Sequence, residues 1–222
     1  MFVITADQIG SRTAPDRSAP MQAALQHDHG RALALPVDQT AGDELQALTD
    51  DPATALDLIL DLARDGHWSI GLGIGGIRSP LPDAVRKATG PAFIAARDAV
   101  DAAKRADGRF ALRVEAPRAD GDAPERRRAG HVEALVRMFL LMRSRRSDAG
   151  WEVAGLVADG ASQKQAAKVL GISDAAVSQR LKSAMWSVDE QVRPALVALL
   201  GELDEQTAAT GDGVDGGDGP PR

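Results

Sequence analysis

The stretch that most constrains this chain of 222 residues is 162–182, which reads SQKQAAKVLGISDAAVSQRLK. Ser162, followed three residues later by a glutamine, has the form of a capping box that begins a short helix. Ala167, Gly171 and Val177 then fall at the spacing A-x3-G-x5-V. In a helix-turn-helix the alanine is small where two helices cross, the glycine takes the turn, and the valine fixes the second helix on the first. The spacing therefore predicts a helix-turn-helix.

The second helix of this motif is expected to have a cap, an apolar face and a polar face. Ser173 offers an N-cap, and Val177 and Leu181, four residues apart, would bury on one side. The polar positions would face the major groove of duplex DNA. The candidate DNA-binding residues are Ser173, Asp174, Ser178, Gln179, Arg180 and Lys182. Two alternatives stay open: a helical hairpin that serves only packing, and a motif that contacts a protein.

Charge is distributed unevenly along the chain, whose net charge is −6. Residues 1–120 hold 13 basic and 17 acidic side chains, a balance of −4. Residues 126–182 hold 11 basic and 5 acidic side chains, a balance of +6. The basic surplus surrounds the predicted motif, where contacts to phosphates would need it. Chance clustering is the alternative, because Arg126, Arg127 and Arg128 fall in a predicted linker.

Composition excludes several kinds of site. The chain has no cysteine, which excludes disulfides and thiolate metal sites, and its four histidines include no H-x3-H pair. Hydrophobic residues make up 44% of the chain but aromatic residues only 3%, so the cores must be built from Ala, Leu, Val and Ile. No basic region precedes a long apolar run, and no apolar stretch reaches membrane-spanning length. These features predict a cytoplasmic protein without a membrane partner.

The N-terminal half alternates strand and helix patterns. The expected strands are 2–6, 31–37, 45–48, 68–74 and 109–115, and the expected helices are 21–29, 51–66 and 90–106. The order is β-α-β-β-α-β-α-β, and its first six elements predict a ferredoxin-like or palm-type α/β sandwich. Because the C-terminal half shows only helical patterns, the predicted fold class is α+β.

The expected domains are a palm at 1–116, a polar linker at 117–129, an all-α helix-turn-helix domain at 130–206 and a disordered tail at 207–222. Residues 187–206 carry an apolar stripe close to a heptad. This stripe can pack back onto the domain or form a homodimer, and Pro194 within it leaves the choice open.

Two resemblances follow from these motifs. The stretch 162–182 resembles the second half of a sigma-factor or response-regulator DNA-binding domain. Four pieces of the N-terminal half are similar, in order, to the palm of class III nucleotidyl cyclases and diguanylate cyclases. They are VITADQIGS (3–11), AGDELQAL (41–48), WSIGLGIGGI (68–77) and TGPAFIAARDAVDAAK (89–104). The combination of ITAD-IGSR, GDELQ and a C-terminal helix-turn-helix resembles the SatD family more closely still, across residues 1–200.

Such a palm needs two carboxylates from neighbouring strands, which share divalent cations that neutralise a triphosphate. The candidate metal ligands, with Mg²⁺ as the expected ion, are Asp7, Asp43 and Glu44. The loop after the first strand can offer amides and a cation to phosphate oxygens, and the resemblance implies a role for the helix arginine. The candidate nucleotide contacts are therefore Gly10, Ser11, Arg12 and Arg97. The alternative is that Asp7 only caps a loop and that GDE is an ordinary hairpin turn.

The chain also departs from the cyclase pattern. The resemblance implies an asparagine four residues before Arg97, but Phe93 stands there and cannot hold a ribose hydroxyl. The glycines of 71–76 are expected to permit close packing of a strand on a helix, because no P-loop lysine follows them. The sequence therefore predicts a DNA-binding regulator whose palm senses a nucleotide or a divalent metal. A nucleotide cyclase or polymerase-like enzyme with a helical accessory domain is the alternative.

Overall fold

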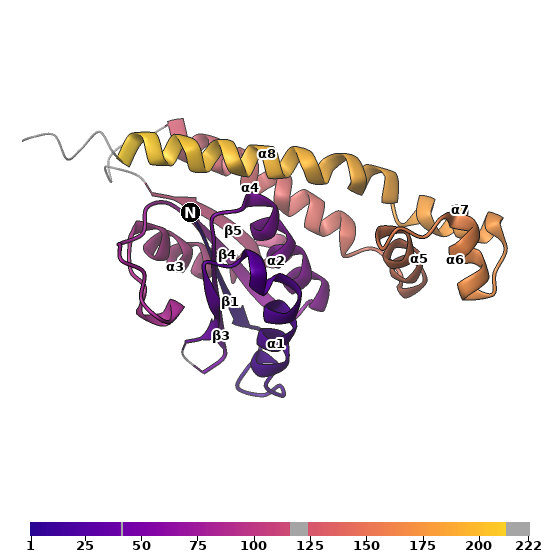
Figure 1. The fold of residues 1–222 in the computed structure, drawn as a ribbon, viewed down its shortest axis with the longest axis horizontal. Helices are drawn as coiled ribbons and strands as arrows, with labels where there is room; N and C mark the ends of the chain where they lie inside the picture. The colour runs from indigo at the N-terminus through magenta and orange to yellow at the C-terminus, as the bar shows by residue number, and fades with distance from the viewer. Residues whose placement is uncertain (41, 116–123, 212–222) are drawn as a thin grey trace, which may run out of the picture. The chain divides into compact units, whose positions relative to one another are not determined.

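The structure is a computed structural model that describes residues 1–40, 42–115 and 124–211. The chain divides into two compact units (Figure 1). Met1–Arg137, together with the chain from Leu196, forms the first, which we call the sheet unit. Met138–Ala195 forms the second, which we call the helical unit. With a five-stranded sheet and many helices, the chain is α+β, as predicted.

The predicted order of strands and helices in the N-terminal half is confirmed, but the second strand, expected at 31–37, begins only at Leu35, because Gly30–Ala32 form a 3-10 helix that continues the preceding helix. The elements there are β1 (Phe2–Gln8), α1 (Ser18–His29), β2 (Leu35–Gln39), β3 (Glu44–Thr49), α2 (Pro52–Asp65), β4 (Trp68–Ile74), α3 (Pro91–Ala103) and β5 (Phe110–Val114). The helices that follow are α4 (Pro124–Arg143), α5 (Asp148–Ala158), α6 (Gln163–Leu170), α7 (Asp174–Ser183) and α8 (Trp186–Gly211).

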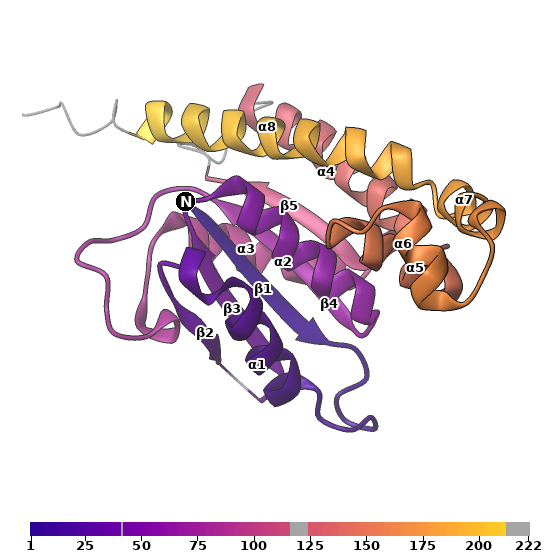
Figure 2. The ribbon, with the colours of Figure 1, turned by 45° about the vertical axis from the view of Figure 1, so that its right-hand side comes forward.

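The strands form one sheet in the order β2-β3-β1-β4-β5. β1 lies at its centre, antiparallel to both β3 and β4, while β5 runs parallel to β4 at one edge. Helices α1 and α2 cover one face of the sheet, and α3 covers the other (Figures 1 and 2). The register places Asp7 of β1 directly opposite Glu44 of β3 and Ser69 of β4.

Helix α3 packs against β4 without side chains between their backbones. A Cβ atom added at Gly71 would lie 2.7 Å from the carbonyl oxygen of Ala96, and one added at Gly73 would lie 2.8 Å from the Cα atom of the same residue. Cβ atoms in proteins essentially never come this close to atoms that are not bonded to them, so both positions require glycine. The prediction that the glycines of 71–76 permit close packing of a strand on a helix is therefore confirmed for Gly71 and Gly73, whereas at Gly76 an added Cβ would meet only the Glu115 carboxylate, at 3.4 Å.

Helix α2 shows how the sequence sets the bounds of an element. Asp51 caps it by accepting the amides of Ala53 and Thr54, and Pro52 occupies its first turn. The side-chain hydrogen bond from Thr54 is the main cause that lowers the pKa of Asp51. Gly66 ends the helix at φ 76°, in the left-handed region that glycine adopts without strain.

Helix α4 covers the free edge of β5. Glu133 accepts the Leu112 amide at 2.8 Å, and Arg137 donates to the Phe110 carbonyl at 3.2 Å. Backbone groups that a sheet edge leaves unpaired are thus bound by side chains of a helix. This contact explains why the first part of α4 belongs to the sheet unit.

The structure differs from the predicted domain limits at three places. Residues 124–129 of the predicted linker are helical, because Pro124 starts α4 and Ala129 is buried in it. Residues 207–211 of the predicted tail continue α8, where the Thr207 hydroxyl donates to the Leu203 carbonyl at 2.7 Å. The stretches 124–137 and 196–211 group with the sheet rather than with the other helices. Residues 116–123 and 212–222 lie outside the described residues.

The helical unit has its own apolar core. Val153 of α5, Ala166 and Ala167 of α6, and Val177 and Leu181 of α7 are buried together. A second cluster is charged: Asp189 accepts hydrogen bonds from Arg143, at 2.6 Å, and from Arg146. Both guanidinium groups also lie over the ring of Trp151, at 5.0 and 4.7 Å from its centroid.

In the three ranges that the structure describes, no helix has both the length and the apolar character that a membrane crossing requires.

Candidate functional sites

The helix pair α6–α7 has the local geometry expected from its sequence. The Ser162 hydroxyl accepts the Gln165 amide at 3.3 Å, and the Gln165 side chain accepts the Ser162 amide at 2.8 Å, which completes the capping box. Gly171 ends α6 at φ 64°. Ser173 then caps α7 by accepting the Ala176 amide at 3.2 Å. Val177 is fully buried. Each of these expectations is confirmed.

The candidate DNA-binding residues fall into two groups on α7. Asp174, Ser178, Gln179 and Lys182 are exposed, and their spacing places them on one side of the helix. Arg180 is only partly exposed and points elsewhere, because its guanidinium lies 3.5 Å from the Glu152 carboxylate of α5. The exposed group, which we call the α7 polar row, is therefore Asp174, Ser178, Gln179 and Lys182.

Two further cations lie near the α7 polar row in the sequence and were not among the candidates. Lys164 and Lys168 are exposed on α6, four residues apart and so on one side of that helix. Their spacing of four residues in the predicted first helix could have identified them as candidate phosphate contacts. Both belong to the helical unit and can add contacts to phosphates.

The candidate metal ligands of the sheet unit do not all lie together. Asp7 and Glu44 are register partners on neighbouring strands, so their side chains stand on the same face of the sheet. Asp43 lies in the turn before β3, and its carbonyl oxygen accepts the Gln8 amide at 3.2 Å. The described residues contain no group of three acidic or histidine side chains that can hold a metal ion.

Helix α3 supplies a cation to each of these two carboxylates. Arg97 lies 3.3 Å from Glu44, and Lys104 lies 3.5 Å from Asp7. The two cations are seven residues apart, which is two helical turns along one side of α3. The Glu44 carboxylate is buried and also accepts the Thr40 hydroxyl at 2.6 Å. We call Asp7, Glu44, Arg97 and Lys104 the charge cluster.

Lys104 was not predicted as a site residue, although its spacing from Arg97 could have indicated it. Burial opposes the charged form of Lys104, but Asp101 and Asp7 outweigh burial and raise the pKa of its ammonium group. Lys104 therefore stays charged beside Asp7. Next to the charge cluster, the Thr5 hydroxyl is buried and has no hydrogen-bond partner among the described residues. Thr5 precedes Asp7 by two residues on β1, so both side chains face the same side of the sheet.

The other candidate nucleotide contacts lie in the loop that leaves β1. Gly10 has a φ of 71°, and Ser11 and Arg12 are exposed beside it. Phe93, one turn before Arg97 on α3, packs against a buried apolar cluster that includes Val3. It therefore offers no hydrogen-bonding group at the position where the cyclase pattern has an asparagine.

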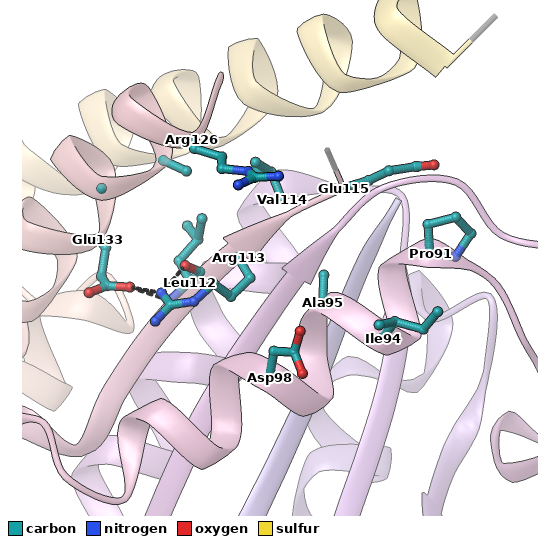
Figure 3. Close-up of a pocket in the computed structure, with 12 residues that line it drawn as sticks. Pro91, Ile94, Ala95, Asp98, Leu112, Arg113, Val114, Glu115, Arg126 and Glu133 are labelled. Atoms are coloured by element: carbon teal, nitrogen blue, oxygen red, sulfur yellow. Dashed lines mark hydrogen bonds and ion pairs between the residues drawn. The ribbon is translucent and has the colours of Figure 1, made fainter. Parts of the chain in front are cut away.

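A cleft of about 850 Å³ opens elsewhere on the sheet unit, between α3, β5 and α4 (Figure 3). It contains none of the candidate residues. Three carboxylates line it: Glu133 binds Arg113 at 2.8 Å, Glu115 accepts the Gly76 amide at 2.8 Å, and Asp98 of α3 is the third. Two of the three are thus engaged in the fold, and the cleft has no pair of register partners comparable with Asp7 and Glu44.

Comparison with known proteins finds no match among family models, curated proteins or solved structures.

Proposed function

We propose that the chain is a DNA-binding regulator, in which the pair α6–α7 acts as a helix-turn-helix. The observation that supports this most strongly is the α7 polar row, exposed on a helix whose opposite side is fixed by Val177 and Leu181. A recognition helix needs this division, because its core side holds it in place while its outer side meets base edges in the major groove.

The cations of the helical unit support the same proposal. Lys164, Lys168 and Lys182 are exposed. Lysines in such positions bind phosphates and release counterions, which supplies the affinity that is independent of sequence. Gln179 and Ser178 are side chains that hydrogen-bond to base edges, so they are the candidates for specificity.

Replacement of Lys182 by alanine tests this assignment. We expect Lys182→Ala to weaken binding to duplex DNA by about 1–3 kcal/mol if the side chain reaches a base edge. If it meets only phosphate, the loss is smaller and the same for all sequences. Arg180→Ala should lose less, because Arg180 is engaged with Glu152. Fluorescence anisotropy with labelled duplexes measures both, and Lys87→Ala in the sheet unit is the control. Equal binding by Lys182→Ala and the unmodified chain would remove α7 as the recognition helix.

For the sheet unit we propose a ferredoxin-like palm and membership of the SatD family. The order β2-β3-β1-β4 supports the palm, since α1 connects two parallel strands that β3 separates, and α2 connects two parallel strands that β1 separates. The order of the sequence motifs supports the family. Strand β5 then extends the sheet at the β4 edge, and helix α3 covers its other face.

We further propose that this palm binds a nucleoside triphosphate with Mg²⁺ at the charge cluster. Mg²⁺ is commonly bound by one or two carboxylates plus phosphate oxygens and waters, so Asp7 and Glu44 suffice without a third acidic ligand. The ion would neutralise phosphate charge there. Arg97 and Lys104 can then pass from the carboxylates to the phosphates, and the unpartnered Thr5 hydroxyl can gain a partner.

The same geometry favours binding over turnover. Phe93 packs in the apolar cluster and supplies no donor next to Arg97. The loss of one preorganised donor typically costs about 3–4 kcal/mol of transition-state stabilisation, or two to three decades in rate. An enzymatic role is therefore the weaker of the two hypotheses.

Titration calorimetry with Mg²⁺ and nucleoside triphosphates tests the palm. We expect Asp7→Ala and Glu44→Gln each to weaken nucleotide binding at least about tenfold, because each removes a ligand that faces α3. Asp43→Asn, the matched control from the adjacent turn, should bind nearly as tightly as the unmodified chain. Product analysis after long incubation should find no cyclic nucleotide. Rapid release of pyrophosphate would instead establish the enzyme, and absence of any nucleotide binding would leave the palm a structural domain.

A further inference from the structure

Each carboxylate of the charge cluster is paired, atom by atom, with a cation of α3. Arg97 lies 3.3 Å from Oε2 of Glu44, and Lys104 lies 3.5 Å from Oδ2 of Asp7. The other oxygen of Glu44, Oε1, accepts the Thr40 hydroxyl at 2.6 Å. The oxygen of Glu44 that a metal ion can take is therefore the one that Arg97 holds.

The cations of these pairs are free to move, whereas the carboxylate of Glu44 is fixed. The side chains of Arg97 and Lys104 are 61% and 41% exposed, but that of Glu44 is only 7% exposed. Asp101 also pairs with Lys104, at 3.1 Å, so the ammonium group has a second partner near the site when it leaves Asp7. A ligand can thus displace both cations without moving α3.

The charges of the cluster oppose the binding of a metal ion or a triphosphate alone. A divalent ion between Asp7 and Glu44 meets Arg97 and Lys104, which repel it at short range. A triphosphate that approaches the two cations is repelled in the same way by the two carboxylates. When both ligands bind, every group faces an opposite charge, because the carboxylates meet the ion and the cations meet phosphate oxygens.

We propose that the charge cluster binds a divalent metal ion and a triphosphate cooperatively, by an exchange of ion-pair partners, and holds neither of them tightly alone. This inference rests on the nucleotide binding proposed above and adds its regulation. Because coupling between two ligands is reciprocal, the metal ion raises the affinity for the triphosphate by the same factor by which the triphosphate raises the affinity for the ion. The palm then responds to the complex of metal and nucleotide, and not to either component.

The exchange predicts that one double substitution changes two affinities in opposite directions. Arg97→Gln with Lys104→Gln removes the cations that a metal ion alone must displace, so the affinity for Mn²⁺ alone should rise at least about tenfold. The same variant lacks the phosphate partners, so its affinity for nucleotide in the presence of Mn²⁺ should fall at least about tenfold. If the two ion pairs served only to hold α3 on the sheet, both affinities would fall.

Equilibrium dialysis of the full chain measures these affinities under three conditions. The probes are Mn²⁺ alone, ATP or GTP with EDTA, and ATP or GTP with Mn²⁺. Asp7→Ala, introduced into the unmodified chain and into the double variant, identifies the Mn²⁺ that binds at the cluster rather than at other carboxylates. Arg105→Gln is the matched control, because Arg105 is an exposed cation next to Lys104 and lies outside the cluster. Circular dichroism establishes that each variant is folded.

The outcomes separate this inference from the proposed function. In the unmodified chain we expect ATP or GTP to bind at least about tenfold more tightly with Mn²⁺ than with EDTA. Equal affinities under these two conditions overturn the inference and leave nucleotide binding standing. A double variant that binds Mn²⁺ alone no more tightly than the unmodified chain overturns it as well. If neither nucleotide binds under any condition, the proposed nucleotide binding is wrong, and the inference falls with it.

Discussion

Asp189→Ala should lower the free energy of unfolding of the helical unit by about 3–5 kcal/mol. Asp189 is 3% exposed and is the acceptor for both Arg143 and Arg146. Burial lowers the pKa of Arg143, and the charge of Asp189 opposes that effect. Without the carboxylate, two guanidinium groups stay in an apolar environment, with the rings of Trp151 and Phe139 and the carbonyl oxygen of Ala184 as compensation.

The size of this effect is decisive for a small unit. A unit of about 60 residues is typically stable by only about 3–9 kcal/mol, so most of that stability would be lost. Glu190→Ala is the matched control, because Glu190 is the next residue and is exposed. Urea denaturation followed by tryptophan fluorescence measures both, since Trp151 and Trp186 belong to the helical unit.

A triple variant separates the charge effect from a packing effect. Replacing Arg143 and Arg146 with Met and Asp189 with Leu removes all three charges of the cluster, so the cost should fall well below that of Asp189→Ala. If the triple variant is as unstable as the single one, packing volume rather than uncompensated charge holds the cluster together.

Gly71→Ala and Gly73→Ala should each destabilise the sheet unit by about 3 kcal/mol, at the upper end of what overpacking costs. The atoms that a new methyl group would meet belong to the backbone of α3, including Val100 and Ala92. A backbone cannot rotate away as a side chain does, so the whole helix must shift. That shift also moves Arg97 and Lys104 relative to their carboxylates, and we expect nucleotide binding to weaken in parallel.

Gly76→Ala is the control for the glycine prediction. An added Cβ there meets only the Glu115 carboxylate oxygen, at 3.4 Å, which a flexible side chain can accommodate. Its effect should stay within about 0.5 kcal/mol. Urea denaturation followed by circular dichroism reports the midpoints. Equal midpoints for Gly71→Ala and Gly76→Ala would show that α3 is not fixed by close approach to β4.

The parts of the fold that the sequence predicts well are those set by local chemistry. Ser162, Ser173 and Gly171 occupy caps and a turn whose geometry depends on a few neighbouring residues, so their sequence pattern was sufficient. Both ends of the strand Trp68–Ile74 were predicted correctly, because small and apolar residues alternate along it.

The parts that the sequence did not predict depend on contacts between distant segments. The spacing of Lys104 from Arg97 shows that the two share a side of a helix, but its ion pair with Asp7 requires α3 to lie across the sheet. Arg180 likewise leaves the α7 polar row only because α5 brings Glu152 beside it. The boundary of the sheet unit was missed for the same reason. Glu133 and Arg137 look like ordinary surface charges until β5 supplies the backbone groups that they bind.

The three candidate metal ligands show that closeness in the sequence does not by itself predict which side chains share a site. Asp43 and Glu44 are adjacent in sequence, but only Glu44 is in register with Asp7. Asp43 lies in the turn before β3, outside the paired residues, so its position next to Glu44 in the sequence does not place its side chain beside Asp7. The pairing of strands, which the sequence does not state, decides which of the two faces α3.

The central claim is that the helical unit binds duplex DNA, and the salt dependence of binding by the full chain tests it most directly. Anisotropy titrations of one labelled duplex at several salt concentrations give the slope of log K against log salt. With three phosphate contacts per chain, from Lys164, Lys168 and Lys182, the slope should be about −2.7, because each contact contributes about −0.9. No binding even at low salt, or binding with a slope near zero, would contradict the claim.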